Sequence, residues 1–225
     1  LAHIQNQNRS SGDMPWDKIA FQRELAMEKA LKDTYARALA KEHGITVSDE
    51  RIATLLEQTR KESGLSEKAY AAATWDNLHW TMDEMKLALK NDLLRQEVAF
   101  RVDDDASKVV KEATRLIQGG STLEEVAQKL GEQVEYVADV VVPTGNADGG
   151  LSSEVSQLKV GDVSEPIKTS ATDGYYIAIR QQASDGYVAY SYVKVPLTTF
   201  EKNFKLLRES DRTTLYITIK DKEAK

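Results

Sequence analysis

The sequence LKVGDVSEPIKT at residues 158–169, followed by GYYIAIR at residues 174–180, decides how the second half of the chain folds. Gly161 and Asp162 interrupt the apolar pattern of the first string, which indicates a turn that leads into a strand. The second string is rich in aromatic and β-branched residues, which favours another strand over residues 175–180. The rest of the fold can be predicted outward from these two strands.

Further strands are predicted on both sides of this pair. Ala183-Ser184-Asp185-Gly186 is a hairpin signal, and the strand that follows it at residues 187–195 would pair antiparallel with residues 175–180. On the other side, residues 134–142 first alternate between apolar and polar positions and then become an apolar run, which indicates a strand. A last strand is predicted at residues 215–219, after a short capped helix.

The remaining segments carry the helical period. Apolar residues recur at helical spacing over residues 16–102 without a strand pattern among them, and two more helices are predicted before the first strand. We therefore predict an α+β fold, in which an all-helical N-terminal domain is joined to a small mixed sheet with helices. The predicted parts are a flexible tail at 1–15, the helical domain at 16–102, the sheet domain at 103–182, and a C-terminal strand-helix-strand segment at 183–225 that completes the sheet.

Composition limits the classes of function. The chain has 225 residues, of which 41% are hydrophobic and 29% charged, and its net charge is −6. This acidic balance argues against nucleic acid as a partner, because phosphate binding needs a basic face. The absence of cysteine excludes thiolate metal sites and cysteine nucleophiles, and it suits an oxidising compartment. No apolar run reaches the ~20 residues of a membrane helix, and since the sequence opens at Leu1 and not at methionine, we expect an export or anchor segment to precede it.

Two parts of the sequence resemble protein-folding factors. In the helical half, GITVSDE at 44–50, GLS at 64–66 and TMDEM at 81–85 occur in an order similar to that in the helical chaperone domain of SurA and its relatives. In residues 105–181, GGSTLEEVAQKLG followed by LKVGDVSEPIKT and GYYIAIR resembles a parvulin, a peptidyl-prolyl cis-trans isomerase. Both parts in one chain resemble the exported foldases of the SurA and PrsA type. The resemblance implies an extracytoplasmic location, in the periplasm or at the outer face of the cytoplasmic membrane. It also implies that the full-length protein can carry a membrane anchor.

The catalytic residues that the parvulin resemblance implies are replaced in this sequence. Parvulins carry one histidine on the first strand and one on the last, beside an apolar pocket for proline. Here histidine is confined to the tail and the helical half, at His3, His43 and His79. Tyr176 stands in the last-strand position, and Tyr192 stands in the first-strand position if residues 187–195 occupy that place in the sheet. We therefore expect the isomerase activity to be weak or lost, which leaves open whether the protein is an enzyme.

Two groups of side chains are candidates for binding an unfolded chain. Methionine and aromatic residues suit adaptable apolar surfaces, although at helical spacing they are also typical of a core. The helical group is interpreted as core, with client binding as the alternative, and consists of Trp75, Trp80, Met82 and Met85. The group on the predicted sheet consists of Tyr176 and Tyr190.

The histidines and the acidic run of the sequence do not indicate a metal or cofactor site. The three histidines are too scattered to hold a metal ion, and no motif indicates a cofactor. The acidic run at residues 103–105 is interpreted as a solvated cap at the start of a helix. These interpretations leave polypeptide as the expected ligand.

Three functions follow from these observations. The first is a chaperone that binds unfolded or nascent exported polypeptides, with no nucleic acid as a partner and with membrane contact only through a segment outside this chain. The second is an active peptidyl-prolyl isomerase, and the third is a cell-surface scaffold that docks a stable partner. Helical chaperone domains of this kind can exchange elements between protomers, so a homodimer is an open alternative.

Overall fold

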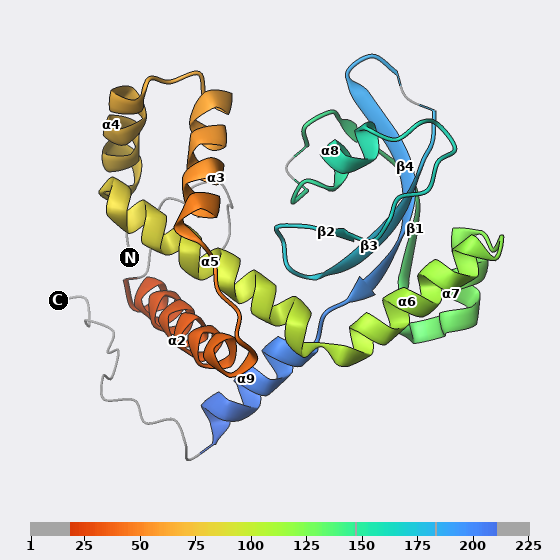
Figure 1. Cartoon of the computed structure of the whole chain (residues 1–225), viewed down its shortest axis with the longest axis horizontal. Coiled ribbons are helices and arrows are strands. Elements are labelled where there is room, and N and C mark those ends of the chain that lie inside the picture. Colours follow the sequence, from red (N-terminus) through yellow and green to blue (C-terminus); the bar gives the residue numbers. More distant parts are fainter. Residues whose placement is uncertain (1–18, 147, 183, 211–225) are drawn as a thin grey trace. The chain divides into compact units, whose positions relative to one another are not determined.

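The computed structural model describes residues 19–146, 148–182 and 184–210 (Figure 1). Within these ranges the chain forms eight α-helices and one four-stranded antiparallel sheet, so it is a mixed α+β protein. It divides into two compact units, which we call the helical unit and the sheet unit. Of the described residues, 19–98 and 204–210 belong to the helical unit, and those between Ala99 and Asn203 belong to the sheet unit. The predicted tail at 1–15 and the predicted strand at 215–219 lie outside the described residues.

The helices of the helical unit begin where the sequence offers caps. The Ser48 hydroxyl accepts a hydrogen bond from the Arg51 backbone N–H at 3.2 Å, and the Ser66 hydroxyl accepts one from that of Ala69. Each such cap satisfies a helix N–H that lacks a partner within the helix. The helices are α2 (Ile19–His43), α3 (Asp49–Glu62), α4 (Glu67–Leu78) and α5 (Met82–Val102), and the boundary between the units falls within α5 and within α9 (Thr199–Glu209).

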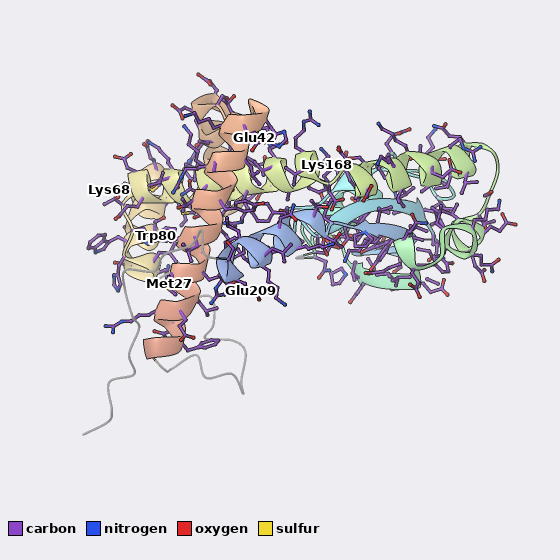
Figure 2. All side chains as sticks on the ribbon, turned by 90° about the horizontal axis from the view of Figure 1, so that it is seen from below. Met27, Glu42, Lys68, Trp80, Lys168 and Glu209 are labelled. Carbon is purple, nitrogen blue, oxygen red and sulfur yellow. The ribbon has the colours of Figure 1, made fainter. Side chains whose placement is uncertain are left out.

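The contacts between these helices are partly apolar and partly charged. An apolar cluster around Ile52, Leu56 and Leu93 joins α3 to α5. Ion pairs join α2 to α5: Lys29 Nζ lies 2.7 Å from Asp92 Oδ1, and the Arg95 guanidinium contacts Asp33. Figure 2 shows α2, marked by Met27 and Glu42, crossing α5. Charged side chains therefore take part in holding the helical unit together.

The sheet has the strand order β1-β4-β3-β2, and all neighbouring strands among the described residues are antiparallel, so the prediction of a mixed sheet is wrong for this part of the chain. β4 is therefore an inner strand, paired with β1 on one side and with β3 on the other. The predicted pairing of residues 187–195 with residues 175–180 is confirmed, with Ala178 opposite Tyr192. The strands are β1 (Glu135–Pro143), β2 (Ile167–Lys168), β3 (Gly174–Arg180) and β4 (Tyr187–Pro196).

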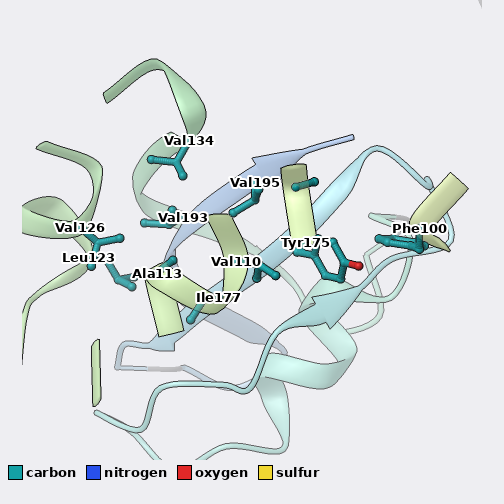
Figure 3. Packing of buried hydrophobic residues seen from close by; sticks show 11 residues of the cluster. Phe100, Val110, Ala113, Leu123, Val126, Val134, Tyr175, Ile177, Val193 and Val195 are labelled. Atoms are coloured by element: carbon teal, nitrogen blue, oxygen red, sulfur yellow. The ribbon is translucent and has the colours of Figure 1, made fainter. Parts of the chain in front are cut away.

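Helices cover parts of both faces of this sheet. On one face, α6 (Asp104–Gln118) and α7 (Leu123–Leu130) pack against side chains that alternate along β3 and β4. Figure 3 shows Val110 and Ala113 of α6 directed at this layer. On the other face, Leu151 and Val155 of α8 (Leu151–Ser156) pack against Ala178 and Val188. Because alternate strand residues point to opposite faces, successive residues of GYYIAIR pack in turn against α6 and α7 on one face and against α8 on the other.

Strand β1 contains a bulge. Its register with β4 shifts between Val137 and Val140, and Asp139 in the bulge has a φ of 55°, in the left-handed region that few non-glycine residues adopt. The Asp139 backbone N–H donates a hydrogen bond to the Ser191 hydroxyl at 3.1 Å. This contact to β4 holds the bulge in a defined position.

The interpretation of residues 103–105 as a solvated cap is wrong for Asp103. Its side chain does cap α6, by accepting from the Ala106 N–H at 3.0 Å, but the residue is only 1% exposed. The same carboxylate also accepts from the N–H groups of Thr198 and Thr199, at 2.8 and 2.9 Å. A carboxylate can be buried when several N–H donors replace its water. Asp103 thus serves the first turns of both α6 and α9.

Candidate functional site

The sheet brings together three tyrosines on the face covered by α8. The rings of Tyr176 and Tyr192 have their centroids 5.3 Å apart, and those of Tyr190 and Tyr192 are 6.1 Å apart. Tyr176 comes from β3, and the other two come from the same side of β4 because they are two residues apart. The two positions expected to replace the parvulin histidines, Tyr176 and Tyr192, are therefore in contact. We call these three residues the tyrosine cluster.

One end of the cluster is held by charged groups that the sequence reasoning missed. The Tyr176 hydroxyl donates to Asp173 Oδ2 at 2.9 Å, and Lys194 Nζ lies 3.0 Å from the same oxygen. Lys194 Nζ also lies 5.8 Å from the centroid of the Tyr176 ring, within cation–π range. The period-2 pattern could have revealed Lys194, since it follows Tyr190 and Tyr192 on one face of β4, but no local signal pairs it with Asp173.

The backbone next to Asp173 leaves no room for a side chain. A Cβ at Gly174 would lie 2.6 Å from the Val195 carbonyl oxygen on β4, closer than van der Waals contact allows. The glycine therefore lets β3 approach β4 at the start of the strand, which sets Asp173 beside Lys194. This is a physical reason for the glycine that opens the GYYIAIR string.

The other end of the cluster is tied to α8. The Tyr190 hydroxyl donates to Asp148 Oδ2 at 3.2 Å, and Asp148 accepts from the Ser152 backbone N–H at 3.0 Å and from the Ser152 hydroxyl at 3.2 Å. Ser152 is fully buried. The loop before α8 and the inner strand β4 are thus joined through one carboxylate.

The phenols of the cluster stay neutral at physiological pH. Burial, together with the neighbouring Asp173 carboxylate, raises the pKa of Tyr176 above its ordinary value. Burial and the Asp148 carboxylate do the same to the pKa of Tyr190, and burial raises the pKa of Tyr192. A neutral phenol donates one hydrogen bond and offers no negative oxygen.

Asp173 and Lys194 form an ion pair beside these phenols. Burial opposes the charge on Asp173, but hydrogen bonds from Lys194 and Tyr176 outweigh it and lower the pKa of the carboxyl group. Burial likewise opposes the charge on Lys194, and the contact with Asp173 outweighs it and raises the pKa of the amine. Both groups are therefore charged at neutral pH, and neither is poised to exchange a proton with a ligand.

The arrangement suits binding more than proton transfer. Among the described residues, the Tyr192 hydroxyl has no hydrogen-bond partner, so it can donate to a carbonyl oxygen of a bound chain. The rings of Tyr176 and Tyr190 are only 8% and 2% exposed, so the expectation that these two residues bind a client directly is wrong, and the half-buried Tyr192 is the member of the cluster that a ligand can reach. In the same ranges, no group of three or more His, Cys, Asp or Glu side chains could hold a metal ion. Contact with a bound chain at this site would therefore go through Tyr192.

The helical candidates do not form one site. Trp75 is 54% exposed near the end of α4, with its ring centroid 6.1 Å from that of His79, so its interpretation as a core residue is wrong. Met85 packs against the apolar cluster of α3 and α5. Trp80, in the link between α4 and α5 (Figure 2), and Met82 at the start of α5 are both half-buried. Only Trp75 of the four presents most of its surface to solvent.

No family model, no curated protein and no solved structure matches this chain. Of the helices that the structure describes, each is too short or too polar to cross a lipid bilayer. The geometry of the site is therefore what supports a functional proposal.

Proposed function

We propose that this protein is a chaperone of the SurA and PrsA type, which binds unfolded or extended polypeptides through an N-terminal helical chaperone domain and a parvulin-like sheet domain. The observation that carries the proposal is the contact between Tyr176 and Tyr192, whose ring centroids are 5.3 Å apart on neighbouring strands. These are the two positions at which the parvulin resemblance implies histidines. Isomerase activity is weak or lost, because neutral phenols stand where imidazoles would.

Exposed apolar side chains in the helical unit support the chaperone function. Trp75 on α4 is 54% exposed and Leu87 on α5 is 58% exposed. Large apolar side chains in solvent can bind apolar segments of a client. The favourable free energy is about 25 cal/mol per Å² of apolar surface buried, and the entropy cost of ordering the client reduces it. Binding of this kind is weak and tolerant of sequence. The clients are exported polypeptides, and the location is extracytoplasmic.

An aggregation assay tests this function. Light scattering of thermally denatured citrate synthase should fall as the protein is added, and equal scattering with and without the protein would refute the proposal. Trp75→Ala should weaken the suppression. The matched control is Tyr187→Ala, which removes an aromatic side chain of similar exposure, 50%, from the first residue of β4.

A second candidate function is an active peptidyl-prolyl isomerase. The observation that favours it is the Tyr192 hydroxyl, which lies beside Tyr176 and has no hydrogen-bond partner among the described residues. Rotation about the prolyl bond must overcome a barrier of roughly 18–20 kcal/mol, and a donor to the twisted amide would lower it. A protease-coupled proline-peptide assay decides between the two functions. A rate above background that Tyr192→Phe abolishes supports the isomerase.

A further inference from the structure

The face of the sheet opposite the tyrosine cluster is only partly covered. Helices α6 and α7 pack over Ile177, Val193 and Val195, and beyond the turn between the two helices a groove of about 470 Å³ opens. Its floor includes Ile179 and Ser191, which are directly paired across β3 and β4. The groove is therefore separate from the candidate site, since paired residues point to the same face and Tyr176 and Tyr192 point to the other.

The groove has an extended floor with apolar sides. Along the floor, the bulge at Asp139 contacts Ser191, Ser191 is paired with Ile179, and Ile179 is bridged to Val163. These are four neighbours in a row across the sheet, about 14 Å long at the usual strand spacing. An extended chain of about four residues has the same length. Val163 and Tyr136, both 38% exposed, supply apolar surface at the two ends.

Polar atoms at the centre of this row complement a peptide group. The Gln181 side-chain N–H₂ donates to Asp139 Oδ1 at 2.9 Å and to the Ser191 hydroxyl oxygen at 3.0 Å. Since a carboxylate only accepts hydrogen bonds, this contact fixes which end of the amide is nitrogen. Ser191 accepts a second hydrogen bond from the Asp139 N–H. The Ser191 hydroxyl hydrogen and the side-chain carbonyl oxygen of Gln181 then have no hydrogen-bond partner among the described residues.

The charge around the groove is negative on balance. The described lining residues include Glu124 and no lysine, arginine or histidine, and Asp139 lies next to the floor. Lys129 lies at the rim, with its Nζ 2.9 Å from the Ser121 hydroxyl, so the two carboxylates outnumber the nearby cation and disfavour phosphates and acidic peptides. The Ser191 donor, the Gln181 acceptor and the apolar sides are features that an uncharged extended peptide requires.

We propose that this groove binds an extended, uncharged polypeptide segment with apolar side chains, as a second binding surface on the sheet unit. The Ser191 hydroxyl donates to a carbonyl oxygen of the segment, and the Gln181 carbonyl accepts from its N–H. Apolar side chains of the segment contact Ile179, Val163 and Tyr136. The inference rests on the proposed function, since it names a surface through which a polypeptide-binding protein would hold its client.

A pair of valine variants tests the groove. Val163→Glu places a carboxylate at the groove wall, whereas Val160→Glu makes the same change three residues away, at a 61% exposed position outside the groove. The probe is a fluorescent, acetylated and amidated heptapeptide with three leucines separated by serines, measured by anisotropy with the full chain. Val163→Glu should weaken its affinity by about tenfold or more, because a carboxylate is costly to bury beside apolar groups. Val160→Glu should leave it within about twofold. Equal affinity for all three proteins, or no binding to the wild type, overturns the proposal.

A measurement on the wild type does not depend on the folding of a variant. Titration with the same peptide should shift the amide NMR signals of Ile179 and Gln181 more than those of α8, and the reverse order overturns the proposal. The aggregation assay separates this inference from the proposed function. If the wild type suppresses aggregation but Val163→Glu leaves peptide binding unchanged, the groove alone is refuted. If the groove binds the peptide but the protein does not suppress aggregation, the chaperone function alone is refuted.

Discussion

In the sheet unit, buried apolar side chains form clusters on both faces of a sheet, whereas in the helical unit ion pairs between α2 and α5 accompany buried apolar residues such as Ala36, Ala40 and Val98. Apolar burial is insensitive to screening by salt, but ion pairs near the surface weaken as salt is added. The comparison indicates a rigid sheet unit that positions the tyrosine cluster, and a helical unit whose packing depends on ionic conditions. Five predictions test this difference.

The largest effect is expected in the core of the sheet unit. Ile177 is 1% exposed within the cluster shown in Figure 3, so Ile177→Ala should lower the free energy of unfolding by about 3–4 kcal/mol. Val141→Ala, at a 63% exposed position on β1, should change it by less than about 0.5 kcal/mol. Urea unfolding, with hydrogen exchange at β3 and β4, measures both. A loss below about 1 kcal/mol for Ile177→Ala would contradict the apolar account of this unit.

The buried carboxylate of Asp103 should have the next largest effect. Asp103→Ala leaves the N–H groups of Ala106, Thr198 and Thr199 without their acceptor, and it should cost about 2–3 kcal/mol in urea unfolding. The matched control is Asp105→Ala, which changes an exposed acid of the same run and should cost less than about 0.5 kcal/mol. Equal effects of the two changes would show that the buried bonds contribute nothing specific.

The same residue predicts a dependence on pH. Burial opposes the charge of Asp103, but hydrogen bonds from the Thr199, Ala106 and Thr198 N–H groups outweigh it, so the pKa of the carboxyl group lies below its ordinary value. A lowered pKa means that its stabilisation is present above the unfolded-state pKa and is lost as the pH falls through the folded-state pKa. Unfolding free energies measured below about pH 4 should therefore fall more steeply for the wild type than for Asp103→Ala.

In the helical unit the expected effect is smaller and depends on salt. The Asp33 side chain is 10% exposed and the Arg95 side chain is 27% exposed, so Asp33→Ala should reduce protection of α2 and α5 amides from hydrogen exchange by about 1–2 kcal/mol. Asp83→Ala removes an acid whose side chain is 94% exposed, and it serves as the control. In the wild type, high salt should lower protection in α2 and leave β3 and β4 unchanged. Equal loss in both units would remove the distinction between them.

The smallest effect concerns the tyrosine cluster. Tyr176→Phe removes the hydroxyl that donates to Asp173, which should cost about 1 kcal/mol and raise the pKa of the Asp173 carboxyl group toward its ordinary value. Tyr192→Phe removes a hydroxyl without a partner among the described residues and should leave both quantities unchanged. Carboxyl NMR titration detects the difference. An unchanged pKa in Tyr176→Phe contradicts the assigned hydrogen bond.

The strands could be predicted from the sequence because their signals are local. Turn residues and alternation mark residues 158–180, and a short hairpin fixes how residues 187–195 pair with β3. This pairing is what allowed Tyr176 and Tyr192 to be placed together before the structure was known. The carboxylate of Asp148, which lies in the loop before α8 and holds Tyr190, was not predicted.

Contacts between distant parts of the chain could not be predicted. Asp103 meets Thr198, 95 residues away, so no periodicity or motif at residues 103–105 distinguishes a buried cap from a solvated one. Trp75 has helical neighbours that suit a core, yet its exposure depends on which face of α4 the other helices cover. The groove at Ser191 likewise requires a bulge in β1, whose position only the register shows.

The most direct test of the chaperone proposal compares two states of one client. The affinity of the full chain for reduced, carboxymethylated α-lactalbumin, which cannot fold, is measured by fluorescence anisotropy beside its affinity for native α-lactalbumin. The exposed side chains of Trp75 and Leu87 predict saturable binding of the unfolded form and none of the native form. Equal binding of both forms, or of neither, would contradict the proposed function.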